Sequence, residues 1–171
     1  MMLETISEAV VYVNGNQYFG ATNEVKLPEI QFKTTERKPT GGIGSIELPA
    51  GVDKMEAEIT WSSYDKQLAA SAFNPRKSTQ IMVRSVKRVF DGTGGLNQEV
   101  SVVTHLTVLP KSLGLGTHKQ GEPIEAPSKF AVHAIKQTMG GQLIVEIDVI
   151  NQVFKMGDED FLSTLRSILG I

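Results

Sequence analysis

The chain has 171 residues, a formal net charge of −2 from 17 basic and 19 acidic side chains, and no cysteine. Its length fits one domain, and the lack of thiols excludes disulfides, thiolate metal sites and a cysteine nucleophile. The charge balance argues against a protein that grips nucleic acid by its phosphates, which requires a basic surface, but not against one past which nucleic acid slides.

The first part of the chain predicts short antiparallel strands. Residues 9–13 are strongly β-prone, and Asn14-Gly15 follows them. Asn and Gly tolerate positive φ, so this pair predicts a hairpin whose return strand is 17–20. Two further extended segments are expected at 24–27 and 30–34.

Residues 36–59 combine features that conflict in an ordinary loop. Glycines and prolines break the segment, yet it also carries Ile43, Ile46, Leu48 and Met55. A solvent-exposed loop has no need of these apolar side chains. A segment buried in the core would leave the N–H and C=O groups of so irregular a backbone with few hydrogen-bond partners. The combination predicts a projecting arm that becomes ordered by packing on another subunit. The alternative is a loop that folds back on its own domain.

A clean strand and a short helix follow. Residues 55–61 alternate with period two, with Met55, Ala57, Ile59 and Trp61 on one face. A helix is predicted over 64–73, with Ser62 or Ser63 as its N-cap and Asp65 in its first turn.

The second half of the chain predicts hairpins and a terminal helix. Strands are expected at 81–90, 99–109, 129–138, 142–147 and 149–155, with a breaker-rich loop over 110–127. Residues 158–170 have the apolar spacing of an amphipathic helix, with acids at its start and glycine at its end. The fold class is therefore mainly β: an antiparallel sandwich or barrel with a short internal helix and a C-terminal helix, in a single domain of residues 1–171.

The sequence predicts neither an enzyme nor a cofactor or metal site. His105, His118 and His133 lack metal-ligand spacing, and the acids at 158–160 are expected to stabilise a helix N-terminus rather than to bind a cation.

The N-terminus lacks the pattern of a signal peptide, and no stretch is long and apolar enough for a membrane span. We therefore expect a protein that is cytoplasmic when made and has no membrane anchor.

Three collinear segments resemble the major tail tube proteins of contractile-tailed bacteriophages (the FII type), and the similar tubes of R-type pyocins. They are "VYVNGNQYFG" near the N-terminus, "VKLPEIQFKTTERKPTGGI" continuing into "GVDKMEAEIT", and "VEIDVINQVFKMGDEDFLSTLRSILGI" at the C-terminus. The chain departs from the family pattern at Lys38-Pro39-Thr40, where proline replaces a polar residue before the glycines.

The resemblance implies a fold shared with the type VI secretion inner tube, hexameric rings whose sheets join edge to edge around a lumen, and stacking of the rings inside a contractile sheath. It implies that an arm at about 33–56 reaches a neighbouring ring. The arm residues are Lys38, Pro39, Gly41, Gly42, Ile43, Ile46, Leu48 and Met55.

Further implications concern partners and place. The expected partners are other copies of the chain, the sheath protein, and the baseplate tube-initiator, tape measure and tail terminator proteins, with DNA passing through the lumen unbound. The expected location is the virion tail, assembled in the host bacterial cytoplasm. Two alternatives remain: the tube of a genome-free injection particle, and a monomeric ligand-binding barrel.

Overall fold

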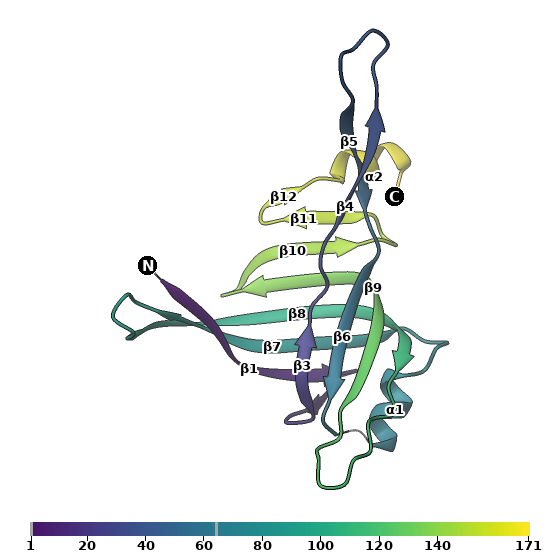
Figure 1. Cartoon of the computed structure of the whole chain (residues 1–171). Coiled ribbons are helices and arrows are strands. Elements are labelled where there is room, and N and C mark those ends of the chain that lie inside the picture. The colour runs from purple at the N-terminus through teal and green to yellow at the C-terminus, as the bar shows by residue number, and fades with distance from the viewer. Residues whose placement is uncertain (1, 64) are drawn as a thin grey trace.

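The computed structural model describes residues 2–63 and 65–171, and these form two antiparallel sheets and two short helices (Figure 1). Tyr64, at the predicted start of the internal helix, lies outside the described residues. The elements are β1 Leu3–Val13, β2 Asn16–Tyr18, β3 Thr22–Lys26, β4 Phe32–Arg37, β5 Ile46–Val52, β6 Met55–Trp61, α1 Lys66–Ala72, β7 Thr79–Phe90, β8 Leu96–Leu113, β9 Ala126–Met139, β10 Gln142–Asp148, β11 Val153–Met156, β12 Glu159–Asp160 and α2 Ser163–Leu169.

The large sheet has ten strands and branches at β9. Its main path runs β12-β11-β10-β9-β8-β7-β1-β2, and β6 and β3 leave this path. Along one side β9 pairs with β8. Along its other side, residues 126–132 pair with β6 and residues 134–139 pair with β10. His133 is the extra residue between these two stretches, at a register shift against β8, so the sheet divides at a bulge.

The branch creates two layers with a core between them. β6 and β3 cross in front of β1, β7 and β8 (Figure 1). The alternating residues of β6 face inward, and Trp61 and Phe130 are the largest fully buried side chains. Buried valines of β1 and β8 supply the opposite wall. The mainly β sandwich or barrel that the sequence predicts is therefore confirmed, in the form of a partly closed barrel.

Local turn chemistry accounts for the predicted hairpins. Asn14 and Gly15 both adopt positive φ, 48° and 84°, in the tight turn that joins β1 to β2. At the β7–β8 turn, the Asp91 carboxylate accepts hydrogen bonds from Thr93 and from the Gly95 amide. These bonds, led by the Thr93 side chain, hold the pKa of Asp91 below its ordinary value.

The two helices differ in detail from the sequence prediction. Asp65, expected in the first turn of α1, is instead its N-cap, with its carboxylate accepting from the Leu68 amide at 2.8 Å. The acids at 158–160 do not begin a helix, because residues 159 and 160 form β12 and the helix starts only at Ser163. Local spacing missed this because a turn at Gly157, with φ 59°, folds the chain back onto β11 first. Gly170 ends α2 in the left-handed conformation, as predicted.

A buried hydrogen-bond relay joins the neighbouring strands β6 and β9. The Trp61 indole Nε1 donates to the Ser128 Oγ at 2.9 Å, and that hydroxyl donates to the Ile59 carbonyl at 2.9 Å. Both Trp61 and Ser128 are fully buried. The indole N–H therefore depends on Ser128 for its partner.

We expect Ser128→Ala to lower the free energy of unfolding by about 1–3 kcal/mol, because it leaves the indole N–H buried without a partner. Urea unfolding of the dissociated subunit measures the change. Ser101→Ala, at an exposed position of β8, is the matched control and should stay close to wild type. Equal unfolding free energies for the two variants would contradict the role of the relay.

Candidate assembly surfaces

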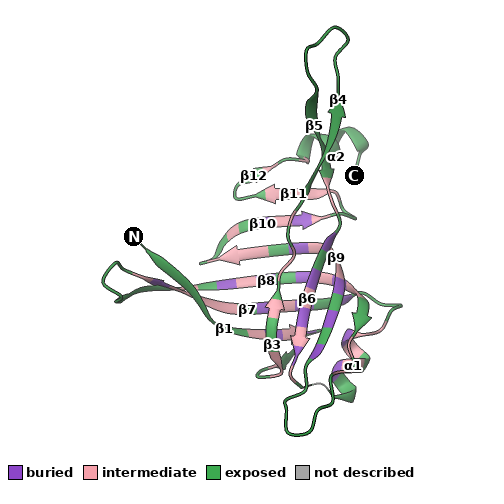
Figure 2. Cartoon of the chain, in the orientation of Figure 1, coloured by how far each residue is buried: buried purple, intermediate pink, exposed green. Residues whose placement is uncertain are grey.

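The segment predicted as an arm is a two-stranded hairpin that stands away from the barrel. β4 and β5 pair only with each other, in a sheet of their own. Every residue of β4 is exposed, as is all of β5 except Val52 (Figure 2). The alternative of a loop folded back on its own domain is therefore wrong. We call residues 32–52 the arm.

The tip of the arm is a turn rich in glycine. The Gly42 amide donates to the Pro39 carbonyl at 3.0 Å, and Gly41 adopts φ 82°, which side chains disfavour. Ile43 follows and is fully exposed. Pro39 therefore supplies the carbonyl that closes this turn.

The predicted arm residues divide into two groups. The structure places most of them together on the exposed hairpin: Lys38, Pro39, Gly41, Gly42, Ile43, Ile46 and Leu48. Met55 does not belong with them, because it starts β6 and is only 2% exposed in the subunit core. The expectation that Met55 is an exposed arm residue is wrong. Its alternation with Ala57 and Ile59 already indicated the inward face.

The two strands of the arm are joined to each other at the base, and an aromatic contact joins that base to the barrel. Lys33 forms an ion pair with Asp53 at 3.5 Å, and the Asp53 amide donates to the Gln31 carbonyl at 2.8 Å. A hydrogen bond from the Lys54 amide, helped by the charge of Lys33, lowers the pKa of Asp53. Phe32 meets Phe154 of β11 edge to face, with ring centroids 6.1 Å apart. The arm is thus a directed projection rather than a loose loop.

The large sheet leaves an unpaired margin along β1. Strand β2 covers only Val11–Val13 of β1, so the edge of residues 3–10 that faces away from β7 has no partner strand among the described residues. These residues are exposed or half-buried (Figure 2). Unpaired edges of this length invite pairing with another chain.

The opposite margin carries β11, β12 and α2. The Arg166 guanidinium of α2 forms an ion pair with Asp160 and donates to the Gln152 carbonyl at 2.9 Å. No residue of α2 is buried, and Leu165, Ile168 and Leu169 are exposed. A helix held by its polar side with its apolar side exposed is a candidate contact surface.

The face of the large sheet that points away from the core carries balanced charges among apolar side chains such as Val10, Met82 and Val103. Opposite charges are register partners on neighbouring strands, as in Lys136 with Glu146 and Glu146 with Lys155. Arg88 and Glu99 form an ion pair at 2.8 Å. The charged side chains of this face are Arg84, Arg88, Lys136 and Lys155 against Glu8, Glu99, Glu146 and Asp148.

The potential metal-ligating side chains of the described residues do not gather in one place. No group of three or more His, Asp or Glu side chains among them could hold a metal ion. His105 and His118 are exposed on separate elements, and His133 lies at the β9 bulge. None of the described helices has the length and hydropathy of a membrane span.

A comparison with known protein families identifies the family of the chain. Residues 3–170 match the model of the phage tail tube protein FII family. The chain belongs to this family. Its members are structural proteins, not enzymes, and the alternative of a monomeric ligand-binding barrel is therefore wrong.

Similar proteins agree with this assignment. The tail tube protein of Escherichia phage P2 is 27% identical over 166 residues, which cover 94% of each chain. Three cryo-EM structures share the fold at 11–12% identity with a TM-score of 0.54, each over 76% of this chain. Two of them belong to the PVC extracellular contractile injection system: the sheath/tube terminator, of which the match covers 92%, and the sheath-tube complex, of which it covers 87%. The third is the tube-terminating cap of the anti-feeding prophage, of which the match covers 87%.

The attachment of α2 should depend on pH through Asp160. The hydrogen bond from Arg166 holds the pKa of Asp160 below its ordinary value. A depressed carboxyl pKa contributes stability that is present above the unfolded-state pKa, about 4, and is lost as the pH falls through the folded-state pKa.

We therefore expect Asp160→Asn to lower the hydrogen-exchange protection factors of the α2 amides several-fold at neutral pH, and the wild-type protection factors, corrected for intrinsic exchange at each pH, to fall to the variant's only in acid below about pH 4. Asp158→Asn, two residues away on an exposed turn, is the control. If both variants exchange like wild type, the Asp160–Arg166 pair does not hold the helix.

Proposed function

We propose that the chain forms the inner tube of a contractile tail by assembling into hexameric rings that stack inside a sheath. The observation that carries the proposal is the arm. It holds apolar side chains in water on a hairpin that makes few contacts with its own barrel. An isolated two-stranded hairpin is marginally stable in water, so a surface on another copy would stabilise both its strands and its apolar side chains.

Within a ring, neighbouring copies join through their sheet margins. The unpaired edge of β1 lies at one side of the large sheet, and β12 lies at the other. Pairing the β1 edge of one copy with the far margin of the next satisfies the backbone groups of both. Because the two margins differ, the contact is heterologous, and it closes into a ring when the rotation between copies divides a full turn.

The charge-balanced face of the large sheet then lines the lumen. Balanced charges on this face, with the ion pair of Arg88 and Glu99 among them, offer DNA phosphates no continuous run of cations. DNA could pass through such a channel into the host cell without being retained. The tube would begin at a baseplate initiator, take its length from a tape measure protein and end at a terminator, in a virion tail assembled in the bacterial cytoplasm.

A second candidate is the tube of a genome-free injection particle. The fold similarity to the PVC extracellular contractile injection system and to the anti-feeding prophage favours this candidate, whereas the relative in phage P2 favours a genome conduit. The genes beside the coding sequence distinguish the two, because only a phage needs a capsid and a terminase.

The arm can be shortened without disturbing its base. Replacing Glu36–Glu47 by Asn-Gly joins Thr35 to Leu48, which are register partners, through a turn suited to a hairpin. We expect this variant to fold and to form single rings that do not stack, whereas wild type forms tubes. Electron microscopy of the purified proteins measures the difference, with the unfolding midpoint as the control for folding.

Ile43→Gln keeps the length of the arm and removes only its apolar tip. We expect this variant to need a higher protein concentration than wild type to form tubes, because less apolar area is buried at each contact.

Tubes of normal length from the variant in which Asn-Gly replaces Glu36–Glu47 would show that the arm has no part in stacking.

A further inference from the structure

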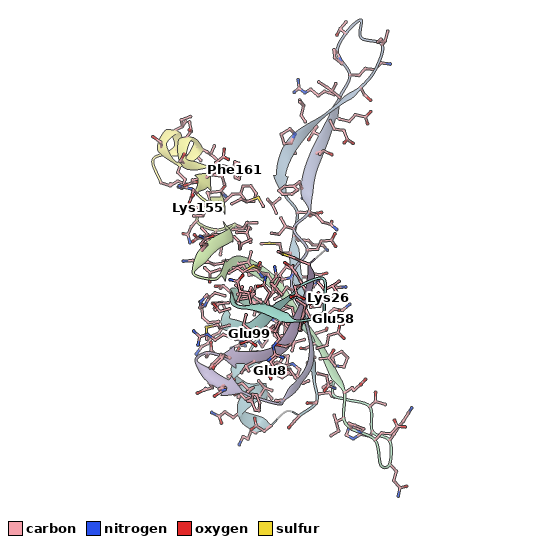
Figure 3. The ribbon with its side chains drawn as sticks, turned by 90° about the vertical axis from the view of Figure 1, so that its left-hand side faces the viewer. Glu8, Lys26, Glu58, Glu99, Lys155 and Phe161 are labelled. Carbon is pink, nitrogen blue, oxygen red and sulfur yellow. The ribbon has the colours of Figure 1, made fainter. Side chains whose placement is uncertain are left out.

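An apolar groove of about 450 Å³ lies between the base of the arm and the C-terminal helix. Phe32 and Phe154 meet at its base, and Phe161 continues the aromatic contact, with its ring centroid 5.0 Å from that of Phe154. Figure 3 shows the arm and the C-terminal region, where Phe161 is labelled, diverging on either side of this space. Its apolar lining includes Phe32, Pro49, Val52, Phe154, Leu162 and Leu165.

The loop that joins β8 to β9, residues 114–125, projects from the opposite end of the subunit (Figure 1). Leu115 is 67% exposed and Ile124 40% exposed on it. In Figure 3 the loop and the arm extend in opposite directions, yet both lie on the side of the barrel that carries Lys26 and Glu58. The subunit therefore has an apolar projection at one end and an apolar groove at the other.

The loop is held in shape at its base by two glycines. The Gly114 amide donates to the Pro127 carbonyl at 2.7 Å, and a Cβ on Gly114 would lie only 2.5 Å from that oxygen. Gly116 adopts φ 94°, and a Cβ there would lie 2.9 Å from the Ile124 side chain. A loop closed in this way loses little conformational freedom when it docks.

The direction of the arm decides which part of a neighbour can fill the groove. The arm and the groove share one end of the subunit, so in a stack of equally oriented copies this end faces the loop end of the next copy. The tip of a neighbour's arm is a poor candidate, because every arm points away from the groove at its own base. The β8–β9 loop is the element that projects toward the groove.

We propose that this groove receives the β8–β9 loop of the next copy in the stack, with Leu115 and Ile124 against Phe154 and Leu165. The proposal rests on the proposed function, because it requires stacked copies. It adds a second longitudinal contact to that of the arm and names both partners in it.

Cysteine cross-linking tests the contact directly, because the natural chain has no cysteine. The test variant carries Leu115→Cys on the loop and Leu165→Cys on α2, and a short bis-maleimide is added to its assembled tubes. Each copy then offers one partner to the copy above and one to the copy below. We expect a denaturing gel to show a ladder that runs beyond the number of copies in a ring.

Controls separate this contact from others. Each single variant should stay monomeric on the gel, and so should the pair Leu115→Cys with Leu96→Cys, whose second site is an exposed leucine at the β7–β8 turn. If the test pair does not assemble, Thr117→Cys with Gln152→Cys places the reactive groups at polar positions of the same loop and groove.

The outcomes distinguish the two proposals. Tubes that form and give no ladder with either pair overturn the groove contact and leave the tube function intact. A ladder from the Leu96 control pair as strong as that from the test pair also overturns it. Wild-type protein that forms neither rings nor tubes overturns both.

Discussion

The branching of the large sheet at β9 is the constraint on which the rest of the structure depends. One strand pairs with β8 on one side and divides its other side between β6 and β10, with His133 as the extra residue. Because of this division, β6 can leave the sheet and cross over the core while β10 and β11 continue the flat margin. Two layers, a core and a broad open face all follow from the one bulge.

The same branch also determines the direction in which the arm projects. β6 begins at Met55, which is buried at the root of the arm, and β5 ends only three residues earlier at Val52. The direction of the hairpin is therefore set by β6, because β5 leads directly into this strand and the inward face of β6 is fully packed. On the other strand of the arm, β4, Lys33 forms its ion pair with Asp53 and Phe32 packs against Phe154. A rigid projection of this kind can bind a neighbour at a smaller entropic cost than a loop that must first be ordered.

The subunit leaves three kinds of surface incomplete: the β1 edge, the apolar arm, and the groove beside α2. Each could be a local imperfection if it stood alone. Together they lie at a side and at an end of the barrel, where contacts with copies of the chain would complete them in two directions. Lateral contacts make rings and longitudinal contacts make a tube, which agrees with membership of the tail tube family.

Much of this fold could be predicted from local sequence. Asn14-Gly15 predicted its hairpin, and the alternation from Met55 to Trp61 predicted a strand with one buried face, because turn chemistry and period two are encoded within a few residues. The same alternation, applied consistently, would have placed Met55 in the core.

Other features depend on contacts between distant segments. The acids at 158–160 were predicted as a helix start because β12 is only two residues long and exists through its pairing with β11. Only the start of β4 was predicted, within the extended segment 30–34, and β5 was not, since it lacks clean alternation. The groove could not be predicted at all, because the arm, β11 and α2 each contribute part of it.

Hydrogen exchange of the β1 amides in free and assembled protein tests the central claim most directly, since that claim is that copies of the chain satisfy one another's open surfaces. The amides of residues 3–10 that point away from β7 should exchange quickly in the dissociated subunit and become protected in the tube. The core strand β6 serves as an internal reference and should be protected in both states, because β3 and β9 pair with it on either side. Equal exchange at residues 3–10 before and after assembly would contradict the account.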